Sequence, residues 1–269
     1  MGSEMCIRDS LISNNDFSIA GSFDSFVSER TQNIELLAAK YGLTFTEEIH
    51  AQYAGRNLKS EQIELATQAI YNRQDDLGYY GETTMGLYGF TNQPNVHQFA
   101  LPADGGGGNT YWNGLNAKTP EQIIRDMQQL VYSTSRRTRW AYHTTHIAIP
   151  PEVWEVLAFT ILTGLNSTST ILAAFLTNQQ VLGGGHGKVE IVLAPGLSNA
   201  GINGEPLIVC YNPDPRHLGI LETPGIDARP NVTTVTGTDG LFYKYVGGIA
   251  LLQPLSMTYI NGSIDPATL

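Results

Sequence analysis

Cysteine is almost absent from this chain, and charged residues are scarce. The 269 residues include two cysteines, Cys6 and Cys210, which are too few for a disulfide framework or a cysteine-rich zinc site. Asp, Glu, Lys and Arg make up 15% of the chain, whereas about a quarter is usual for soluble domains. A chain with so little charge tends to be rich in strands and turns, or to bury its surface against partner subunits. The 28 glycines and 13 prolines favour the same interpretation.

Long apolar runs and basic stripes are missing as well. No apolar run reaches the roughly 18–20 residues that a membrane-spanning helix needs, and the longest, 153–165, is interrupted by Glu155. The formal net charge is −10, and the longest basic cluster comprises Arg136, Arg137 and Arg139. Nucleic-acid binding depends on basic residues that neutralise phosphates. We therefore expect neither a membrane partner nor sequence-specific nucleic-acid binding.

The common catalytic and metal-binding motifs are absent too. There is no Gly-x-Ser-x-Gly sequence, and the run 183–187 (GGGHG) lacks the Gly-Lys-Ser/Thr ending of a nucleotide-binding loop, so we interpret it as a linker or turn. His143 and His146 could bind a metal together with His97 or His50. Residues three apart on a strand face opposite sides, however, and this favours ordinary histidines. We expect no catalytic, cofactor-binding or metal-binding residues, and hence no enzyme.

The first ten residues, MGSEMCIRDS, show no helical or strand periodicity. Positions 1–9 match the translation of a transposase sequencing adaptor, and Ser10 is compatible with its last two bases. We therefore exclude residues 1–10 from fold reasoning, as is done for fusion scars. We also expect that Cys6 does not belong to the natural protein and that its true amino terminus is missing.

Clear helix signals follow. Thr44 to Glu47 fits a reciprocal capping box, and 59–77 is an amphipathic helix for which Gly78 is the expected C-cap. The apolar side of this helix consists of Ile63, Ala66, Ile70 and Leu77. A later helix starts at Thr119 as N-cap, with Pro120 at its first position. Two further helices are predicted at 152–159 and 169–178.

Short apolar runs between turns predict strands. They lie at 146–149, 189–193, 207–211, 218–222, 241–246, 249–252 and 257–260. Cys210 lies within one of these strands, so we expect it to be a small buried apolar residue. The glycine run 105–108 predicts a surface loop. Helices and strands mix without regular βαβ alternation, which indicates an α+β fold.

The run GLYGFTNQPNV, residues 86–96, follows the long helix and resembles a Gly-Leu-Tyr-Gly-Leu-x-Asn-x-Pro-x-Val motif. This motif is typical of a family of tailed-phage major capsid proteins that was long catalogued as a domain of unknown function. The matching residues are Gly86, Leu87, Tyr88, Gly89, Asn92, Pro94 and Val96. Later positions that resemble the family pattern are Tyr211, Asp214, Pro215, Gly247, Gly248, Pro254, Tyr259 and Gly262. The resemblance runs from about Ile34 to Ile264.

The resemblance implies the Hong-Kong-97-type capsid fold. This fold has a peripheral domain built on a spine helix, here 59–77, and an axial domain that faces the capsomer centre. Members begin with an N-terminal arm and a long extended loop, of which almost everything is missing here. The implied division is 11–45 as remnant of the extended loop and return strand, 46–150 as peripheral domain, 151–240 as mainly axial domain, and 241–269 as strands that return to the peripheral domain.

The same resemblance implies a structural protein whose copies form pentamers and hexamers of an icosahedral head around DNA. Its place would be the virion, after assembly in the bacterial cytoplasm, and scaffold or decoration proteins would be further partners. Two alternatives remain open. One is an encapsulin-type nanocompartment shell protein, and the other is an α+β hydrolase or binding protein with an unrecognised site.

Overall fold

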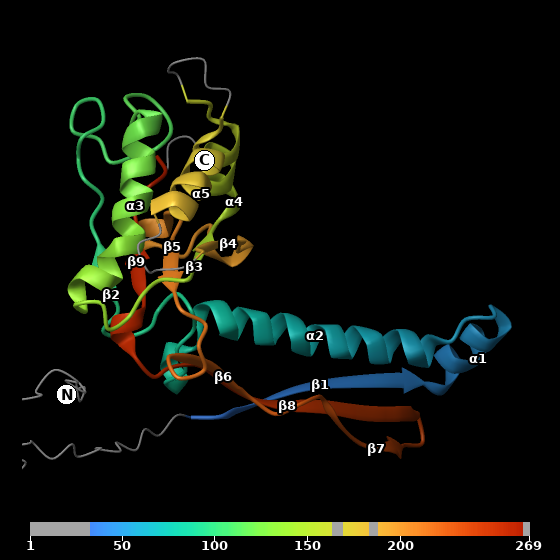
Figure 1. Cartoon of the computed structure of the whole chain (residues 1–269). Helices are drawn as coiled ribbons and strands as arrows, with labels where there is room; N and C mark the ends of the chain where they lie inside the picture. Colours follow the sequence, from blue (N-terminus) through green and yellow to red (C-terminus); the bar gives the residue numbers. More distant parts are fainter. Residues whose placement is uncertain (1–32, 163–168, 183–187, 266–269) are drawn as a thin grey trace, which may run out of the picture. The chain divides into compact units, whose positions relative to one another are not determined.

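The computed structural model describes residues 33–162, 169–182 and 188–265, and all of them belong to one compact unit. We divide this unit into two regions for description. The arm contains a long helix and a narrow antiparallel sheet, and the body contains a second sheet covered by helices (Figure 1). None of the helices in the described residues is long and apolar enough to cross a membrane.

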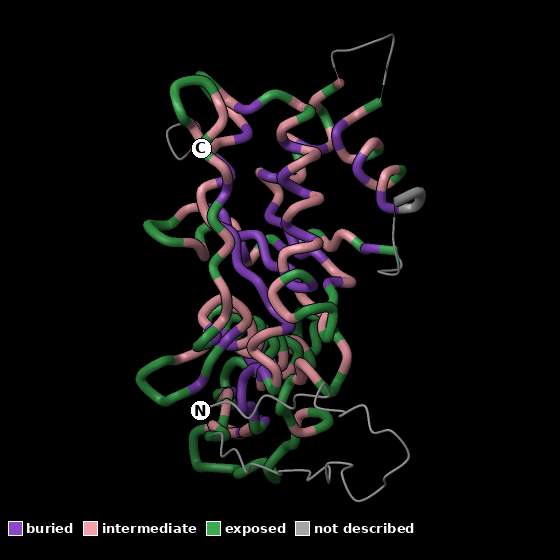
Figure 2. Tube along the Cα trace, turned by 60° about the vertical axis from the view of Figure 1, so that its left-hand side comes forward, coloured by how far each residue is buried: buried purple, intermediate pink, exposed green. Residues whose placement is uncertain are grey.

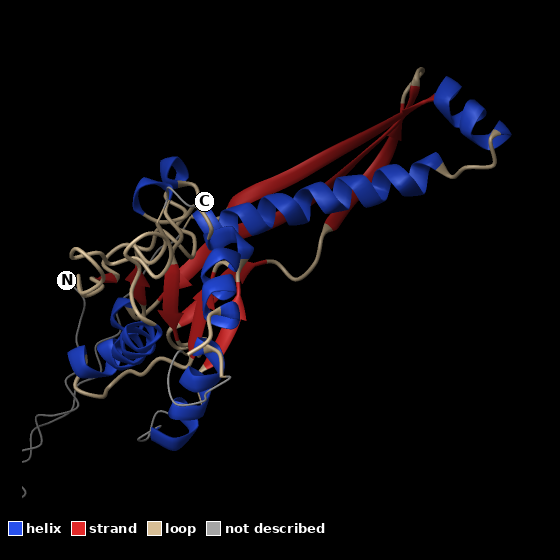
Figure 3. Cartoon of the chain, turned by 90° about the horizontal axis from the view of Figure 1, so that it is seen from above, coloured by secondary structure: helices blue, strands red, loops and turns tan. Residues whose placement is uncertain are grey.

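The arm is one long helix packed on a sheet (Figures 1 and 3). In this sheet the central strand β8 pairs with β1 on one side, and with β6 and β7 on the other, all antiparallel. The bounds are β1 Glu35–Thr44, α2 Leu58–Tyr80, β6 Leu218–Glu222, β7 Asp227–Thr233 and β8 Gly237–Leu251.

The sequence pattern of the arm explains its layers. Alternate residues of β1 are exposed, as expected for a strand with one covered and one open face. The face of α2 that packs on the sheet consists of Ala66, Ile70 and Leu77. Buried Lys244 of β8 donates to Gln74 of α2 at 2.9 Å. The short helix α1 (Phe45–Tyr53) begins with the predicted capping box.

The predicted end of the long helix is wrong by three residues. Helix α2 continues through Gly78 and ends at Gly81, which has φ +64° and whose amide donates to the carbonyl of Leu77. A glycine ends a helix well only where the chain needs the left-handed conformation. Sequence spacing alone did not show which of the two glycines adopts it.

The two strands predicted at 241–246 and 249–252 are a single strand, β8. Gly247 and Gly248 do not form a turn. Instead Gly248 has φ +70°, and the pairing of β6 with β8 shifts register nearby. A glycine in the left-handed region accommodates such an irregularity without interrupting the strand. Strand β7 was not predicted because all seven of its residues are exposed, so it lacks an apolar alternation.

The body is built on a five-stranded mixed sheet in the order β2-β9-β5-β3-β4. Strands β2 and β9 are parallel, as are β3 and β4, and the other pairs are antiparallel. The bounds are β2 His97–Phe99, β3 His146–Ile149, β4 Glu190–Leu193, β5 Ile208–Tyr211 and β9 Thr258–Ile260. The three-residue β2 was not predicted.

The main core of the body packs between this sheet and three helices, α3 (Pro120–Arg137), α4 (Pro151–Phe159) and α5 (Ile171–Leu182). Figure 2 shows buried residues along the strands and on the inner sides of the helices. Helix α3 starts with the predicted capping box and Pro120. Core side chains include Trp112, Ile123, Met127, Leu130, Ile147, Ile149, Val153, Leu157, Phe175, Ile208 and Cys210. The predicted α+β class is confirmed.

Candidate functional site

The motif 86–96 folds back on the last turn of α2. A Cβ atom on Gly89 would lie 2.4 Å from the amide nitrogen of Gly81 and 2.5 Å from the carbonyl oxygen of Tyr79. Real Cβ atoms do not approach backbone atoms so closely. Position 89 therefore requires glycine because two backbone segments touch there.

The motif also binds the carbonyl groups that a helix end leaves without intrahelical partners. The amide of Phe90 donates to the carbonyl of Gly78 at 2.7 Å. The side chain of Asn92 donates to the carbonyl of Tyr80 at 2.7 Å, and its oxygen accepts from the amide of Gly89 at 2.6 Å. The run thus acts as a cap that holds the end of α2 in one orientation.

A second set of bonds ties the cap to β8 and β9. The buried side chain of Gln93 donates to the carbonyls of Gly89 and Ile249 at 2.8 and 2.9 Å. The hydroxyl of Tyr259 donates to the carbonyl of Phe90 at 2.7 Å and accepts from the amide of Gln93 at 3.1 Å. Burial raises the pKa of Tyr259 far above its usual value, so the hydroxyl stays a donor. We call this connection, built on residues 78–93 with Ile249 and Tyr259, the joint.

Other motif residues lie in or next to the joint. The ring of Tyr211 packs edge-on against Phe90, with ring centres 5.1 Å apart. Leu87 is completely buried, whereas Tyr88 is exposed and accepts from the amide of Ile249 through its carbonyl at 3.0 Å. Val96 is partly buried and packs against a second core cluster, which includes Leu197, Val209 and Tyr259. These residues hold elements together.

Most of the remaining family-pattern residues lie outside the main strands, and two glycines lie within strand β8. Asp214 and Pro215 lie between β5 and β6, where the Asp214 side chain accepts from the amide of Arg216 at 2.9 Å. Gly86 and Gly262 have φ +73° and +74°. The other residues of this set are Pro94, Pro254, Gly247 and Gly248, of which Pro254 opens a single helical turn before β9 and the two glycines lie within β8.

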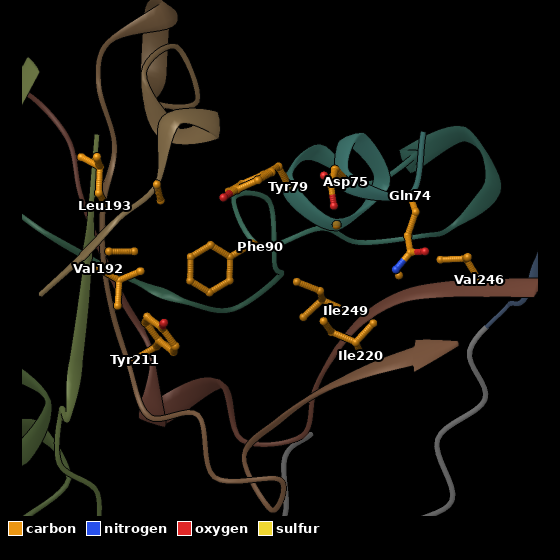
Figure 4. Close-up of a pocket in the computed structure, with 14 residues that line it drawn as sticks. Gln74, Asp75, Tyr79, Phe90, Val192, Leu193, Tyr211, Ile220, Val246 and Ile249 are labelled. Carbon is orange, nitrogen blue, oxygen red and sulfur yellow. The ribbon is translucent and has the colours of Figure 1, made fainter. Parts of the chain in front are cut away.

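A cavity of about 260 Å³ lies beside the joint (Figure 4). Its lining comes from α2, from strands β3, β4, β5, β6 and β8, and from the motif. It is largely apolar: Tyr79, Phe90, Val192, Leu193, Tyr211, Ile220, Val246 and Ile249, with Gln74 and Asp75 at one side. Burial, and then the nearby carboxylate of Glu190, raise the pKa of Tyr211. Sequence reasoning missed this cavity because its walls are distant in sequence.

The body also holds a buried ionic cluster that the sequence did not predict. Lys118 has no exposed side-chain surface, contacts equally buried Asp126, and lies 3.2 Å from Asp104. Arg125 binds both carboxylates. Burial opposes ionisation of Asp104, but hydrogen bonds from Arg125 and Lys118 prevail and lower its pKa. The cluster fastens the loop at Asp104 to helix α3.

The residues considered for chemistry are not brought together. Within the described ranges, no three His, Cys, Asp or Glu side chains are placed to hold a metal ion. His146 has Glu190 as its neighbour, with Nε2 3.5 Å from the carboxylate oxygen. Cys210 is completely buried, as predicted, and burial raises the pKa of its thiol. The run 183–187 lies outside the described residues.

A family model described as major capsid protein matches residues 10–262. This chain belongs to the major capsid protein family. The capsid protein is a structural shell subunit of the phage type, and the resemblance seen in its sequence is confirmed. No curated protein matches it.

Solved structures support the Hong-Kong-97-type fold of this capsid protein. The capsid of Myoviridae phage XM1 has a TM-score of 0.70 at 16% identity, covering 86% of this chain and 74% of that chain. The capsid of the native GTA particle has a TM-score of 0.63 at 10% identity, covering 94% of this chain and 81% of that chain. The SrpI encapsulin of Synechococcus elongatus PCC 7942 has a TM-score of 0.51 at 12% identity, covering 86% of this chain and 74% of that chain.

Proposed function

We propose that this protein is the major capsid protein of a tailed bacteriophage or prophage, and that its copies form an icosahedral head around packaged DNA. The family match over residues 10–262 carries the proposal. The TM-score of 0.70 to a phage capsid, against 0.51 to an encapsulin, favours a phage head over a cargo compartment. The encapsulin-type shell is the second candidate.

The proposed division is the extended loop and return strand ending at residue 45, a peripheral region at 46–150 around α2, a mainly axial region at 151–240, and returning strands at 241–269. In the arm, a single helix packs on the sheet, and many residues of β1 and β7 are exposed. This exposure supports a role in which neighbouring subunits cover the sheet. Assembly takes place in the bacterial cytoplasm through pentamers and hexamers, with scaffold or decoration proteins as further partners.

The proposed protein has no catalytic role. The residues of its family pattern act on backbone geometry, as Gly89 and Asn92 do at the end of α2. The most deeply buried charged side chains, Lys118 and Asp126, bind one another within the body.

Expression of the whole reading frame tests the proposal. We expect closed shells or capsomer rings in electron micrographs and a matching mass by light scattering. A monomer at every salt and protein concentration would contradict shell formation. Nucleic acid inside the particles, with terminase and portal genes nearby, indicates a phage head. An enzyme inside, with its gene adjacent, indicates the encapsulin-type alternative.

A further inference from the structure

The turn after α3 presents an exposed aromatic and basic group. Arg139 and Trp140 have φ +52° and +69°, so two consecutive non-glycine residues adopt the left-handed conformation. That conformation is costly for such residues and is typical of functional positions. The amide of Trp140 donates to the carbonyl of Ser135 at 2.7 Å, which holds the turn in place. The Trp140 side chain is 57% exposed, and Arg136 and Arg139 are exposed beside it.

The cavity at the joint has complementary properties. About 260 Å³ is less than the roughly 300–1,000 Å³ of small-molecule sites and suits one large side chain. Tyr79, Phe90 and Leu193 give it apolar and aromatic walls (Figure 4). Carboxylates lie close by, because Asp75 lines the cavity and Glu190 opens strand β4. Within the described part of the chain, neither carboxylate forms an ion pair with a lysine or arginine.

The turn and the cavity lie toward different edges of the body sheet, whose edge strands are β2 and β4. The end of α3 lies by β9, where Thr134 bonds Thr258 at 3.0 Å and Arg137 donates to the carbonyl of Met257 at 3.3 Å. The cavity borders β4, which is the edge strand at the other end of the sheet order (Figure 1). Two different, complementary surfaces on one molecule can make a head-to-tail contact, and such a contact can close into a ring.

We propose that Trp140 of one copy inserts into the joint cavity of a second copy, with Arg136 and Arg139 facing Asp75 and Glu190. This inference rests on the proposed shell function, which requires contacts between copies but does not specify them. Tryptophan and arginine are frequent anchors of interfaces because they bury a large surface and form charge-assisted hydrogen bonds. The rim charges orient the approach, and the buried indole provides most of the affinity.

Directed disulfide formation tests the geometry in the full-length chain. Cys6 is replaced by serine, while completely buried Cys210 remains. One chain carries Arg139→Cys, next to Trp140, and another carries Leu193→Cys, at a cavity residue that is 49% exposed, so that the indole of Trp140 stays in place. A mixture of the two chains should form cross-linked dimers under mild oxidation, and each chain alone should not.

A matched control uses Leu115→Cys in place of Arg139→Cys, because Leu115 is 85% exposed in the body and precedes α3, whereas the proposed contact follows the other end of that helix. The mixture of the Leu115 and Leu193 variants should cross-link only at background level. Cross-linking of the Arg139 variant no better than this control overturns the proposal. Equal cross-linking of the Arg139 variant with itself indicates a two-fold contact and overturns it as well.

Association strength gives a second readout. Sedimentation velocity of Trp140→Ala should show association about thirtyfold weaker, as expected for a buried aromatic anchor. Leu115→Ala, which truncates an exposed side chain of the body, should leave association unchanged. Arg139→Glu and Asp75→Arg should each weaken association, and the double variant should recover it. Circular dichroism checks that every variant is folded.

The outcomes separate this proposal from the proposed function. Normal shells or rings from Trp140→Ala would overturn the Trp140 contact and leave the shell function intact. A wild-type chain that stays monomeric throughout would contradict both. Loss of binding to a different protein, with unchanged self-association, would assign the turn to another partner and overturn the contact between copies.

Discussion

The body and the arm differ in how much of each is buried. The body encloses a core of completely buried side chains between a sheet and three helices, among them Met127, Leu130 and Phe175. In the arm, the 23-residue α2 has three buried residues, and all seven residues of β7 are exposed. Buried apolar area is the main source of stability. The body therefore has more buried apolar area to stabilise it than the arm has.

The largest expected effect is in the core of the body. Phe175→Ala removes a completely buried ring from α5 and should lower the free energy of unfolding by about 3–5 kcal/mol. Leu65→Ala on α2, where the side chain is 68% exposed, should change it by less than about 0.5 kcal/mol. Urea denaturation of both variants measures the difference. Similar losses would contradict the contrast between the two regions.

Ion pairs sharpen the same contrast. Asp126→Asn leaves buried Lys118 with a weaker partner and should cost about 3 kcal/mol or slightly more. In the arm, Arg56 and Glu61 form an exposed pair at 2.8 Å, and Glu61→Gln should cost less than about 1 kcal/mol. Thermal unfolding of the two single variants measures the two losses of stability. A large effect at Glu61 would show that the arm is more tightly built than its exposure suggests.

Two glycines of the joint region should respond in opposite directions. Gly89→Ala forces a Cβ against the backbone of Gly81 and should destabilise the protein by about 1–3 kcal/mol. Gly78→Ala meets nothing within 4 Å inside α2 and should stabilise it by about 0.5–1 kcal/mol. Chemical denaturation provides the measurement. A tolerated Gly89→Ala would mean that the backbone contact between arm and body is loose.

The smallest effect concerns pH. The pKa of Asp104 is lower in the folded chain than in the unfolded chain, so its ionic contacts add stability above the ordinary aspartate pKa. This contribution is lost as the pH falls through the lowered folded-state value. We expect the stability difference between the wild type and Asp104→Asn to shrink between neutral pH and pH of about 3. Midpoints of urea unfolding measured over this pH range test the prediction. A stability difference that does not change with pH would contradict a stabilising role for the ionic contacts of Asp104.

Local signals in the sequence predicted most helices and buried strands correctly. The capping boxes at Thr44 and Thr119 gave the starts of α1 and α3, because the interacting groups are three residues apart. The strand at 146–149 was predicted with its observed bounds. The motif 86–96 identified the family, although its role at the joint depends on contacts with Ile249 and Tyr259 that no local pattern reveals.

Other features depended on distant partners. Gly78 and Gly81 are equally plausible helix ends in sequence, and packing of Gly81 against Gly89 decides between them. Strand β7 exists because β8 supplies its hydrogen-bonding partner, while its own residues are all exposed. The cavity and the cluster around Lys118 combine side chains from separate elements.

The sequence by itself determined the family, the α+β class and the ends that are set by capping residues within one turn. Only the tertiary structure decided how the end of α2 meets β8 and β9, where the cavity opens, and which charges are buried. The physical reason is the distance along the chain over which each interaction acts. Propensity and capping act over three or four residues, whereas burial and backbone contact depend on segments that folding brings together from more than a hundred residues apart, such as Gln93 and Ile249.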